Sequence, residues 1–549
     1  MANLFLGSLF QFCYFAELNY SGSGQYDRAN DSKQNARGFH SLKCQLIYIE
    51  IYLINHTKGL IYNNNNHFAM RVLQVFKQYN RTFWASNVIE LFERWAWYGF
   101  YMAFALYLVN SKDTGALGLS QAEKGIIMGT GSMLLYLLPL ITGAIADRLG
   151  YTRMLLLSFT IYISGFYMIR SFDTFGMVFF AYIWTCVGGA LFKPIISAMI
   201  ARTTTEETSS IGFGIFYMMI NIGGFIGPFI AGVMLNKSWD YVFYISMLTM
   251  SINYVITLLF FKDPVKKEGN VSLGQSIGKA FGNIAEALSN WKYVIFLIIM
   301  ILFWTAFNQL YYSFPVFVDQ WVDTGTIYNG LHSVWPWLAE IIGTDQGTIS
   351  AVTLSSMDAF FIIVFQLAVS ALVMSFRPLA AMMGGILVLS GGVGLMFSTQ
   401  SGWLILLGIL IFSLGEMASS PKFTEYIGRI APNDKKALYM GTSFLPIAAG
   451  HQLAGWISGG PFERISDKFY LLRKEVISRG IEIPEISDNF SKNDFFSEAA
   501  VRMNMTQTEL TQYLWSNLHP HNIWYIFSGI VLLAVVLLWL YDRFILKAA

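Results

Sequence analysis

Residues 143–153 read Gly-Ala-Ile-Ala-Asp-Arg-Leu-Gly-Tyr-Thr-Arg, and they join two long apolar stretches of this 549-residue chain. Glycine permits close contact between helices and a sharp turn. A carboxylate at such a junction can accept hydrogen bonds from a helix N-terminus or from an arginine. The segment therefore predicts a tight, charged connection between two helices. The residues that give it this character are Gly143, Asp147, Arg148, Gly150 and Arg153.

Apolar segments of similar length recur on both sides of this connection. In the first half they cover 84–110, 120–147, 152–170, 175–202, 209–235 and 239–261. In the second half they cover 292–318, 348–375, 378–398, 402–425, 437–459 and 522–546. Each can cross a hydrocarbon core of ~30 Å as a helix that rises ~1.5 Å per residue. The pattern predicts an all-α polytopic membrane protein with about twelve transmembrane helices.

The composition supports a protein whose solvent is largely hydrocarbon. Only 13% of the residues are charged, whereas an average soluble domain has about 25%. The net charge of +2 gives no reason to expect a nucleic-acid partner. Three scattered cysteines do not suggest a disulfide framework or a metal site. No nucleophile has a base at motif spacing, so we expect no enzymatic activity, no cofactor and no metal.

A polar segment separates the two sets of apolar stretches, and together with the 143–153 loop it points to a known architecture. The loop resembles the G-x-x-x-D-R-x-G-x-x-R signature of the major facilitator superfamily. The resemblance implies two six-helix bundles, a solute site at the midplane between them, and a gating role for the loop. The expected parts are a disordered or artefactual extension 1–69, an N-terminal bundle 70–262, a linker 263–290, and a C-terminal bundle 291–549 with an insertion 461–520.

The distribution of Lys and Arg predicts the orientation in the membrane. Basic residues concentrate on the side of the linker, at Arg71, Lys77, Arg81, Arg148, Arg153, Arg202, Arg377, Lys422, Arg429, Lys435, Lys436, Arg543 and Lys547. The opposite loops hold only Lys112, Lys124, Arg170 and Lys237. Because cytoplasmic loops carry the excess of basic residues, we expect a multi-pass protein of the plasma (inner) membrane with both termini cytoplasmic.

Two polar segments then fall on the outer side. The insertion contains short helical stretches at 463–478 and 496–516 and is most simply a structural cap. Substrate capture or docking of a partner is its alternative role. The loop 319–347 carries Trp321, Trp335 and Trp337, which we expect at the membrane interface.

The first expected helix carries Glu90, Glu93 and Arg94. Positions i, i+3 and i+4 lie on one helix face. An unpaired charge at the bilayer centre costs roughly 2.5–3.5 kcal/mol, so the three must face the protein interior and pair. A proton relay is the functional interpretation, and a snorkelling cluster near the cytoplasmic end is the alternative.

Further motifs resemble the proton-dependent oligopeptide transporter (POT) family over residues 80 to 546. The first-helix motif E-x-x-E-R is followed here by Trp97, Tyr98 and Gly99. The other matching motifs are Phe192-Lys193-Pro194, Phe216-Tyr217 with Ile220-Asn221 and Gly223, Gly415-Glu416, Ser420-Pro421, Met440-Gly441 with Phe444-Leu445, and Gly450 with Leu453-Ala454-Gly455.

The resemblance implies roles for particular residues. Glu90, Glu93, Arg94 and Lys193 would couple protons and recognise a peptide carboxylate, and Glu416 would recognise its amino group. Alternatives remain for two of them: Lys193 could form an internal salt bridge with the first-helix glutamates, and Glu416 could pair with Lys422. The expected substrate-binding residues are Trp97, Tyr98, Lys193, Asn221, Trp304, Asn308, Glu416 and Ser443.

The chain also departs from the family pattern. The seventh-helix acid is replaced by Asn308, while the eighth helix, where the family commonly has Asn, carries Asp358. We therefore predict that Asp358 is the titratable partner in the C-terminal half. Its alternative is an inert position facing an aqueous vestibule. Tyr101 and Ser443 replace a family Arg and Trp, which loosens the prediction of the substrate.

The resulting hypothesis is a secondary active transporter that carries di- or tripeptides, or a related small amphipathic solute, together with protons by alternating access. A non-peptide metabolite is the first alternative, and a transporter-like receptor or assembly factor is the second. Side-chain preference, proton stoichiometry and oligomeric state stay open.

Overall fold

The computed structural model describes residues 76–205, 207–263, 273–487 and 489–546, so the expected extension 1–69 lies outside the described part. From Tyr79 onward, the described residues form one compact unit. Within the described ranges the secondary structure is helical, apart from three isolated β-bridges. The all-α prediction is confirmed.

The first set of helices matches the expected segments closely. It comprises α3 (Arg81–Val109), α4 (Gln121–Leu137), α5 (Pro139–Leu149), α6 (Tyr151–Ser171), α7 (Phe175–Thr203), α8 (Ser209–Leu235) and α9 (Trp239–Phe260). Helices α4 and α5 form one bent span with an angle of 49°. The bend occurs at Pro139, as expected for a residue that has no backbone N–H to donate to the preceding turn.

The second set is interrupted more often. Its spanning helices are α11 (Trp291–Phe307), α16 (Ala351–Ser355) with α17 (Met357–Val373), α18 (Pro378–Ser398), α19 (Gly402–Ile430), α20 (Lys436–Thr442) with α21 (Phe444–Ser458), and α26 (Ile523–Leu540). Shorter helices follow α11, namely α12 (Gln309–Tyr312), α13 (Phe314–Trp321), α14 (Gly325–Val334) and α15 (Pro336–Ile342). The tenth expected helix, 402–425, continues to Ile430.

In the described part of the chain, nine helices are long and apolar enough to cross a membrane, and the bent α4–α5 pair makes ten. Two further expected crossings are not long and apolar enough by the same criteria. Helix α3 carries Glu90, Glu93 and Arg94, and α21 has only 15 residues. Both of these expected crossings contain predicted site residues.

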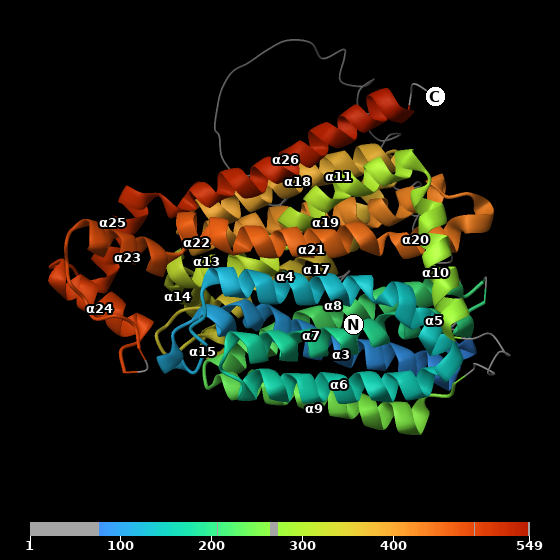
Figure 1. The fold of residues 1–549 in the computed structure, drawn as a ribbon, viewed down its shortest axis with the longest axis horizontal. Coiled ribbons are helices and arrows are strands. Elements are labelled where there is room, and N and C mark those ends of the chain that lie inside the picture. Colours follow the sequence, from blue (N-terminus) through green and yellow to red (C-terminus); the bar gives the residue numbers. More distant parts are fainter. Residues whose placement is uncertain (1–75, 206, 264–272, 488, 547–549) are drawn as a thin grey trace, which may run out of the picture. The chain divides into compact units, whose positions relative to one another are not determined.

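Figure 1 shows how the two ends of this helical unit differ. The linker helix α10 (Leu273–Leu288) runs across one end, beside α5 and α20. We call this the linker end. The helices of the insertion gather at the other, insertion end: α22 (Gly460–Ser466), α23 (Lys468–Ser478), α24 (Lys492–Arg502) and α25 (Gln507–Leu518).

The two sets meet at the insertion end through a close contact of α4 with α21, which we call the insertion-end seam. Gly125 of α4 faces Gly455 of α21, and a Cβ built on Gly125 would lie 2.2 Å from the carbonyl oxygen of Gly455. Small residues permit such an approach between membrane helices. The seam is therefore closed in this structure.

We expect Gly125→Ala to reduce transport by hindering closure of the insertion-end seam. Forcing an extra methyl group into a packed contact costs typically about 1–3 kcal/mol, and each 1.4 kcal/mol changes an equilibrium about tenfold. Uptake into proteoliposomes measures the effect. The matched control is Gly391→Ala in α18, where the added Cβ meets nothing within 4 Å. Equal losses in the two variants would contradict this role of the seam.

The insertion belongs to the second set but bonds to the first. The Lys492 ammonium donates to the carbonyl oxygens of Val109 and Leu119, at 3.0 and 3.1 Å. Asn493 Nδ2 donates to Asp113 Oδ2 at 2.9 Å. Val109 ends α3, so Lys492 satisfies a carbonyl left without an intrahelical partner. Burial lowers the pKa of Lys492. These bonds agree with a cap that spans the seam.

We expect Lys492→Met to loosen the contact between the insertion and the loop 109–119. Hydrogen bonds made by charged groups contribute about 1.5–3 kcal/mol each. Backbone hydrogen exchange in 109–119 should therefore accelerate about tenfold or more. The exposed Lys474 of the same insertion is the control, because Lys474→Met removes the same charge elsewhere. An unchanged exchange rate in Lys492→Met would show that the bonds do not hold this contact.

Two residues that we expected at or near the outer surface are buried. Lys124 is fully buried in α4, where its ammonium donates to Gln121 Oε1 at 2.7 Å and to the Tyr312 carbonyl at 2.9 Å. Trp321 is buried too, and its Nε1 donates to the Ser466 carbonyl at 2.8 Å. Trp335 and Trp337 are exposed, at 57% and 63%. Only tertiary contacts distinguish the buried residues Lys124 and Trp321 from the exposed tryptophans.

Candidate functional site

The three charges of α3 are buried and paired with one another. Glu90, Glu93 and Arg94 are 4%, 1% and 6% exposed. Arg94 Nε lies 3.0 Å from Glu90 Oε1, and an Arg94 terminal nitrogen lies 2.6 Å from Glu93 Oε2. The spacing on one helix face thus produces the expected ion pairs. Side chains that snorkel would be exposed near the end of the helix, so the burial of these three charges argues against that alternative.

Neighbouring helices hold this cluster in place. The Tyr162 hydroxyl of α6 donates to Glu93 Oε1 at 2.7 Å. The Arg94 guanidinium lies 5.8 Å from the Tyr98 ring and 5.9 Å from the Phe192 ring. Helix α8 approaches closely because it presents Gly223, where a Cβ would lie 2.7 Å from the Arg94 Cβ. The motif glycine of α8 is therefore a packing requirement of the charged cluster.

Lys193 of α7 lies near the cluster but is not ion-paired to it. Its ammonium is 4.3 Å from the centre of the Tyr136 ring. Among the described residues, the ion pairs of Glu90 and Glu93 are with Arg94. The internal salt bridge considered for Lys193 is thus not formed. Lys193 instead lines a cavity of about 330 Å³ with Asn283 of α10 and Thr442 of α20, toward the linker end.

A second acidic site lies in the other set of helices. Asp358 of α17 is 5% exposed and accepts a hydrogen bond from the Ser413 hydroxyl of α19 at 2.6 Å. Its carboxyl group lies close enough to that of Glu416 for the two to interact directly. The oxygen Oε2 of Glu416 is buried without a hydrogen-bond partner in the described part of the chain. Asp358 and Glu416 thus form a carboxyl pair, which the sequence alone did not predict.

The alternative prediction that Glu416 pairs with Lys422 is wrong. Lys422 pairs with Glu425, one turn further along α19, with 2.8 Å between Lys422 Nζ and Glu425 Oε2. Glu416 therefore interacts with Asp358 and not with Lys422.

Tyrosines lie between the α3 cluster and the carboxyl pair. Tyr98 interacts electrostatically with Arg94 and Lys193. Tyr217 and Tyr311 each interact with Glu416, with Asp358 and with Tyr98. The Tyr98 and Tyr311 rings are 6.3 Å apart. Tyr311 was not predicted, and only its position two residues after the Phe-Asn-Gln stretch could have suggested it.

The remaining predicted substrate-binding residues fall into different surroundings. Trp97 is 4% exposed and packs on Tyr101 at 5.3 Å, so its geometry favours helix packing. Trp304 Nε1 and Asn308 Nδ2 are buried without partners in the described part, at the break between α11 and α12. Ser443 donates to the Met440 carbonyl at 2.6 Å. Asn221 donates to the Tyr217 carbonyl at 2.8 Å, beside the tyrosines.

The 143–153 loop lies at the linker end and bonds to neighbouring helices. Asp147 accepts from the Tyr151 hydroxyl at 2.7 Å and lies 3.3 Å from a terminal nitrogen of Arg202 in α7. Gly150 has φ of 92°, the left-handed region that favours glycine. Gly143 faces Pro194 of α7, while Arg148 and Arg153 are exposed.

Comparison with known proteins adds a family and related folds. The sequence pattern of the Major Facilitator Superfamily matches residues 88–450. Dipeptide and tripeptide permease A of Erwinia pyrifoliae is 29% identical over 214 residues, which cover 38% of this chain and 42% of that protein. Peptide transporter YePEPT of Yersinia enterocolitica subsp. palearctica is 24% identical over 457 residues, which cover 67% and 86%.

Solved structures agree on the fold. A POT family transporter in complex with 5-aminolevulinic acid has a TM-score of 0.60 and 17% identity, covering 84% of this chain and 96% of that one. The comparisons thus support the predicted resemblance to the POT family and the two-bundle architecture.

Proposed function

The chain belongs to the Major Facilitator Superfamily, and within that family we propose that it carries di- or tripeptides, or a related small amphipathic solute, together with protons. Its match to this superfamily and its similarity to peptide transporters support a transporter rather than an enzyme. The observation that carries the proposal is the arrangement of charge. The Lys193 ammonium, which forms no ion pair within the described ranges, and a buried ion cluster lie in one set of helices, and a carboxyl pair lies in the other.

This arrangement suits a zwitterion between the two sets. Among the described residues Lys193 has no carboxylate partner within ion-pair distance, and it can bind the carboxylate of a solute. Glu416 has an oxygen without a hydrogen-bond partner in the described residues, which can accept from an ammonium group. Tyr98, Tyr217 and Tyr311 supply amphipathic surface between these charges.

The carboxyl pair supports proton coupling. Two carboxyl groups in contact cannot both ionise at low cost, so the Asp358–Glu416 pair shares a proton. A solute ammonium at Glu416 stabilises the ionised pair and so promotes release of that proton. Protonation of Glu90 or Glu93 would in turn weaken their hold on Arg94. Each event changes which arrangement of the two sets is favoured, and alternating access follows as a shift of populations.

The orientation belongs to the same proposal. We place the linker end in the cytoplasm of a cell bounded by the plasma membrane, with both chain termini on that side, because the basic residues concentrate there. The closed insertion-end seam and the Lys193 cavity toward the linker end then correspond to a state that faces the cytoplasm.

Uptake into proteoliposomes under an imposed pH gradient tests the function. We expect labelled dipeptide to accumulate when the outside is acidic and to stop accumulating when a protonophore collapses the gradient. Dipeptide accumulation that does not depend on the pH gradient would contradict proton coupling. No uptake of any dipeptide, with protein that remains folded, would contradict the solute class.

A non-peptide solute is the second candidate, and specific residues favour it. Asn308, Tyr101 and Ser443 depart from the residues that the resemblance to the peptide-transporter family leads us to expect at these positions. A related transporter has been solved with 5-aminolevulinic acid, which is not a peptide. Competition of uptake by a panel of dipeptides and of single ω-amino acids separates the two candidates. A receptor or assembly role for the insertion 461–520 would require that its deletion leave transport intact.

A further inference from the structure

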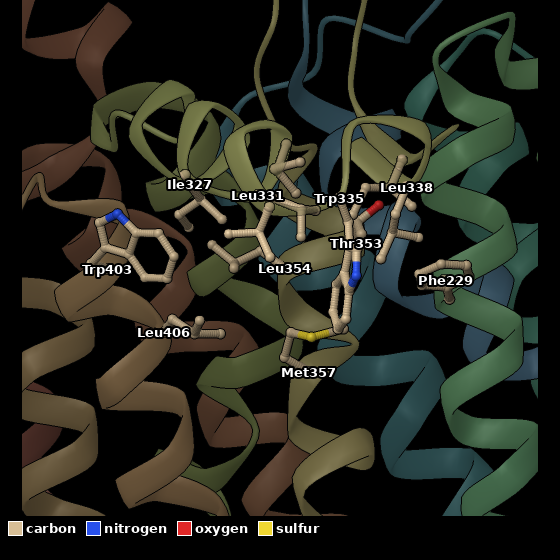
Figure 2. Close-up of a pocket in the computed structure, with 14 residues that line it drawn as sticks. Phe229, Ile327, Leu331, Trp335, Leu338, Thr353, Leu354, Met357, Trp403 and Leu406 are labelled. Carbon is tan, nitrogen blue, oxygen red and sulfur yellow. The ribbon is translucent and has the colours of Figure 1, made fainter. Parts of the chain in front are cut away.

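An apolar pocket of about 390 Å³ lies outside the site described above, at the insertion end. Its walls come from α14 and α15, from the ends of α16, α17 and α19, and from Phe229 of α8. Figure 2 shows Trp403 and Phe229 at opposite ends, with Trp335 and Met357 between them. The one hydroxyl in its lining, that of Thr353, already bonds to Ser350 at 2.9 Å. A pocket that presents only apolar surface holds apolar matter in preference to water.

The pocket lies at the depth of lipid chains. Phe229 is six residues before the end of α8 at Leu235, or about 9 Å along the helix axis. Leu406 lies in the second turn of α19, and Met357 begins α17. All three helices are long and apolar enough to cross a membrane. The pocket is therefore within one leaflet of the hydrocarbon core, on the insertion side.

The hairpin α14–α15 above the pocket has the character of a membrane-interface element. Val334, Trp335, Trp337 and Ile341 are exposed at 68%, 57%, 63% and 51%. Water would be a poor solvent for so much exposed apolar surface, whereas tryptophans are enriched where hydrocarbon meets headgroups. Surface facing lipid thus continues directly from Trp335 into the pocket.

The pocket also crosses between the two sets of helices. Phe229 belongs to the first set, whereas every other lining residue belongs to the second. Beside it, α8 meets α16 closely, since a Cβ on Gly232 would lie 2.1 Å from Thr353 Oγ1. Asn236 Nδ2, just after α8, donates to the Gly343 carbonyl at 2.8 Å. Whatever fills the pocket therefore contacts both sets at once.

We propose that this pocket binds one acyl chain of a membrane phospholipid from the leaflet on the insertion side. The continuous lipid-facing surface, the depth and the wholly apolar surface that the lining presents to the pocket select a hydrocarbon chain over a zwitterionic solute. The chain lies under the α14–α15 hairpin and packs on Phe229 and Met357. This site is independent of which solute the protein carries.

Photolabelling in lipid nanodiscs tests the proposal. The probe is a phosphatidylcholine with a diazirine in mid-chain, in a bilayer of phosphatidylethanolamine and phosphatidylglycerol. In the unaltered protein we expect labelled peptides to be enriched at 354–357 and 403–406. Leu406→Trp fills the pocket from α19 and should reduce this labelling about tenfold. Leu407→Trp is the matched control, because Leu407 is 45% exposed on the same helix and does not line the pocket.

A second variant guards against misfolding of the first. Leu331→Trp fills the same pocket from the hairpin and should give the same loss of labelling. The proposal is overturned if the pocket peptides of the unaltered protein are labelled no more than other lipid-facing peptides. It is also overturned if all three tryptophan variants label alike. If a transported solute displaces the probe, the pocket binds solute and not lipid, and the proposal is likewise overturned.

Discussion

Replacing Arg94 by Met is expected to abolish proton-driven uptake and to destabilise the protein. The change leaves Glu90 and Glu93 buried without their cation. Removing one partner of a buried ion pair costs about 3–5 kcal/mol because it leaves an uncompensated charge. The midpoint of thermal unfolding in detergent and the rate of uptake into proteoliposomes measure the two effects.

The control for Arg94→Met is Arg170→Met. Arg170 pairs with Asp240 at 2.5 Å, but these side chains are 33% and 37% exposed. Pairs so accessible contribute only about 0–1 kcal/mol, so stability and uptake should change little.

A triple variant separates stability from function. Adding Glu90→Gln and Glu93→Gln to Arg94→Met removes the buried charges and should restore much of the stability without restoring uptake. Recovery of proton-driven uptake in that variant would show that the cluster serves packing alone.

Replacing Asp358 by Asn is expected to reduce proton-driven uptake at least tenfold and to flatten its dependence on pH. The variant keeps the shape of the side chain but removes a proton-binding group from the pair with Glu416. One carboxyl group alone no longer has to share a proton with a like charge. Uptake measured across a range of external pH tests the change.

A relocation experiment sharpens this test. Asn308→Asp restores an acid at the seventh-helix position, where Asn308 Nδ2 is buried without a described partner. Combined with Asp358→Asn, it should recover part of the uptake if the acidic function moved from one helix to the other. Ser413→Ala is the control, because it removes a hydrogen bond to Asp358 and leaves the carboxyl group. Unchanged uptake and an unchanged pH profile in Asp358→Asn would refute the role of Asp358.

Local patterns in the sequence predicted most of the helices and one of the two charged sites. Apolar length determines a membrane crossing, because a helix satisfies its own backbone hydrogen bonds in hydrocarbon. The cluster of α3 was predictable for a similar reason, since Glu90, Glu93 and Arg94 are neighbours on one helix and pair within it. The positions of these charges follow from spacing alone.

Contacts between distant segments were not predictable in this way. Asp358 and Glu416 meet only because α17 packs on α19, and nothing in the spacing of 58 residues between them sets that distance. The same holds for Lys124, whose partner Tyr312 is 188 residues away. Pairing of Glu416 with Lys422 was plausible on one helix, but Glu425 lies nearer to Lys422.

The loop 143–153 also has some features that its sequence predicts and others that only tertiary packing decides. Its composition determined a tight, charged turn between two membrane helices, because Gly150 adopts a positive φ that other residues disfavour. Its sequence did not determine the partner of Asp147, which is Arg202 of α7 rather than Arg148 or Arg153 beside it. Local sequence sets helix length, caps and turns through short-range sterics and solvation. Which charges meet across helices was decided only by the tertiary packing of small residues such as Gly223 and Gly125, which bring the backbones together.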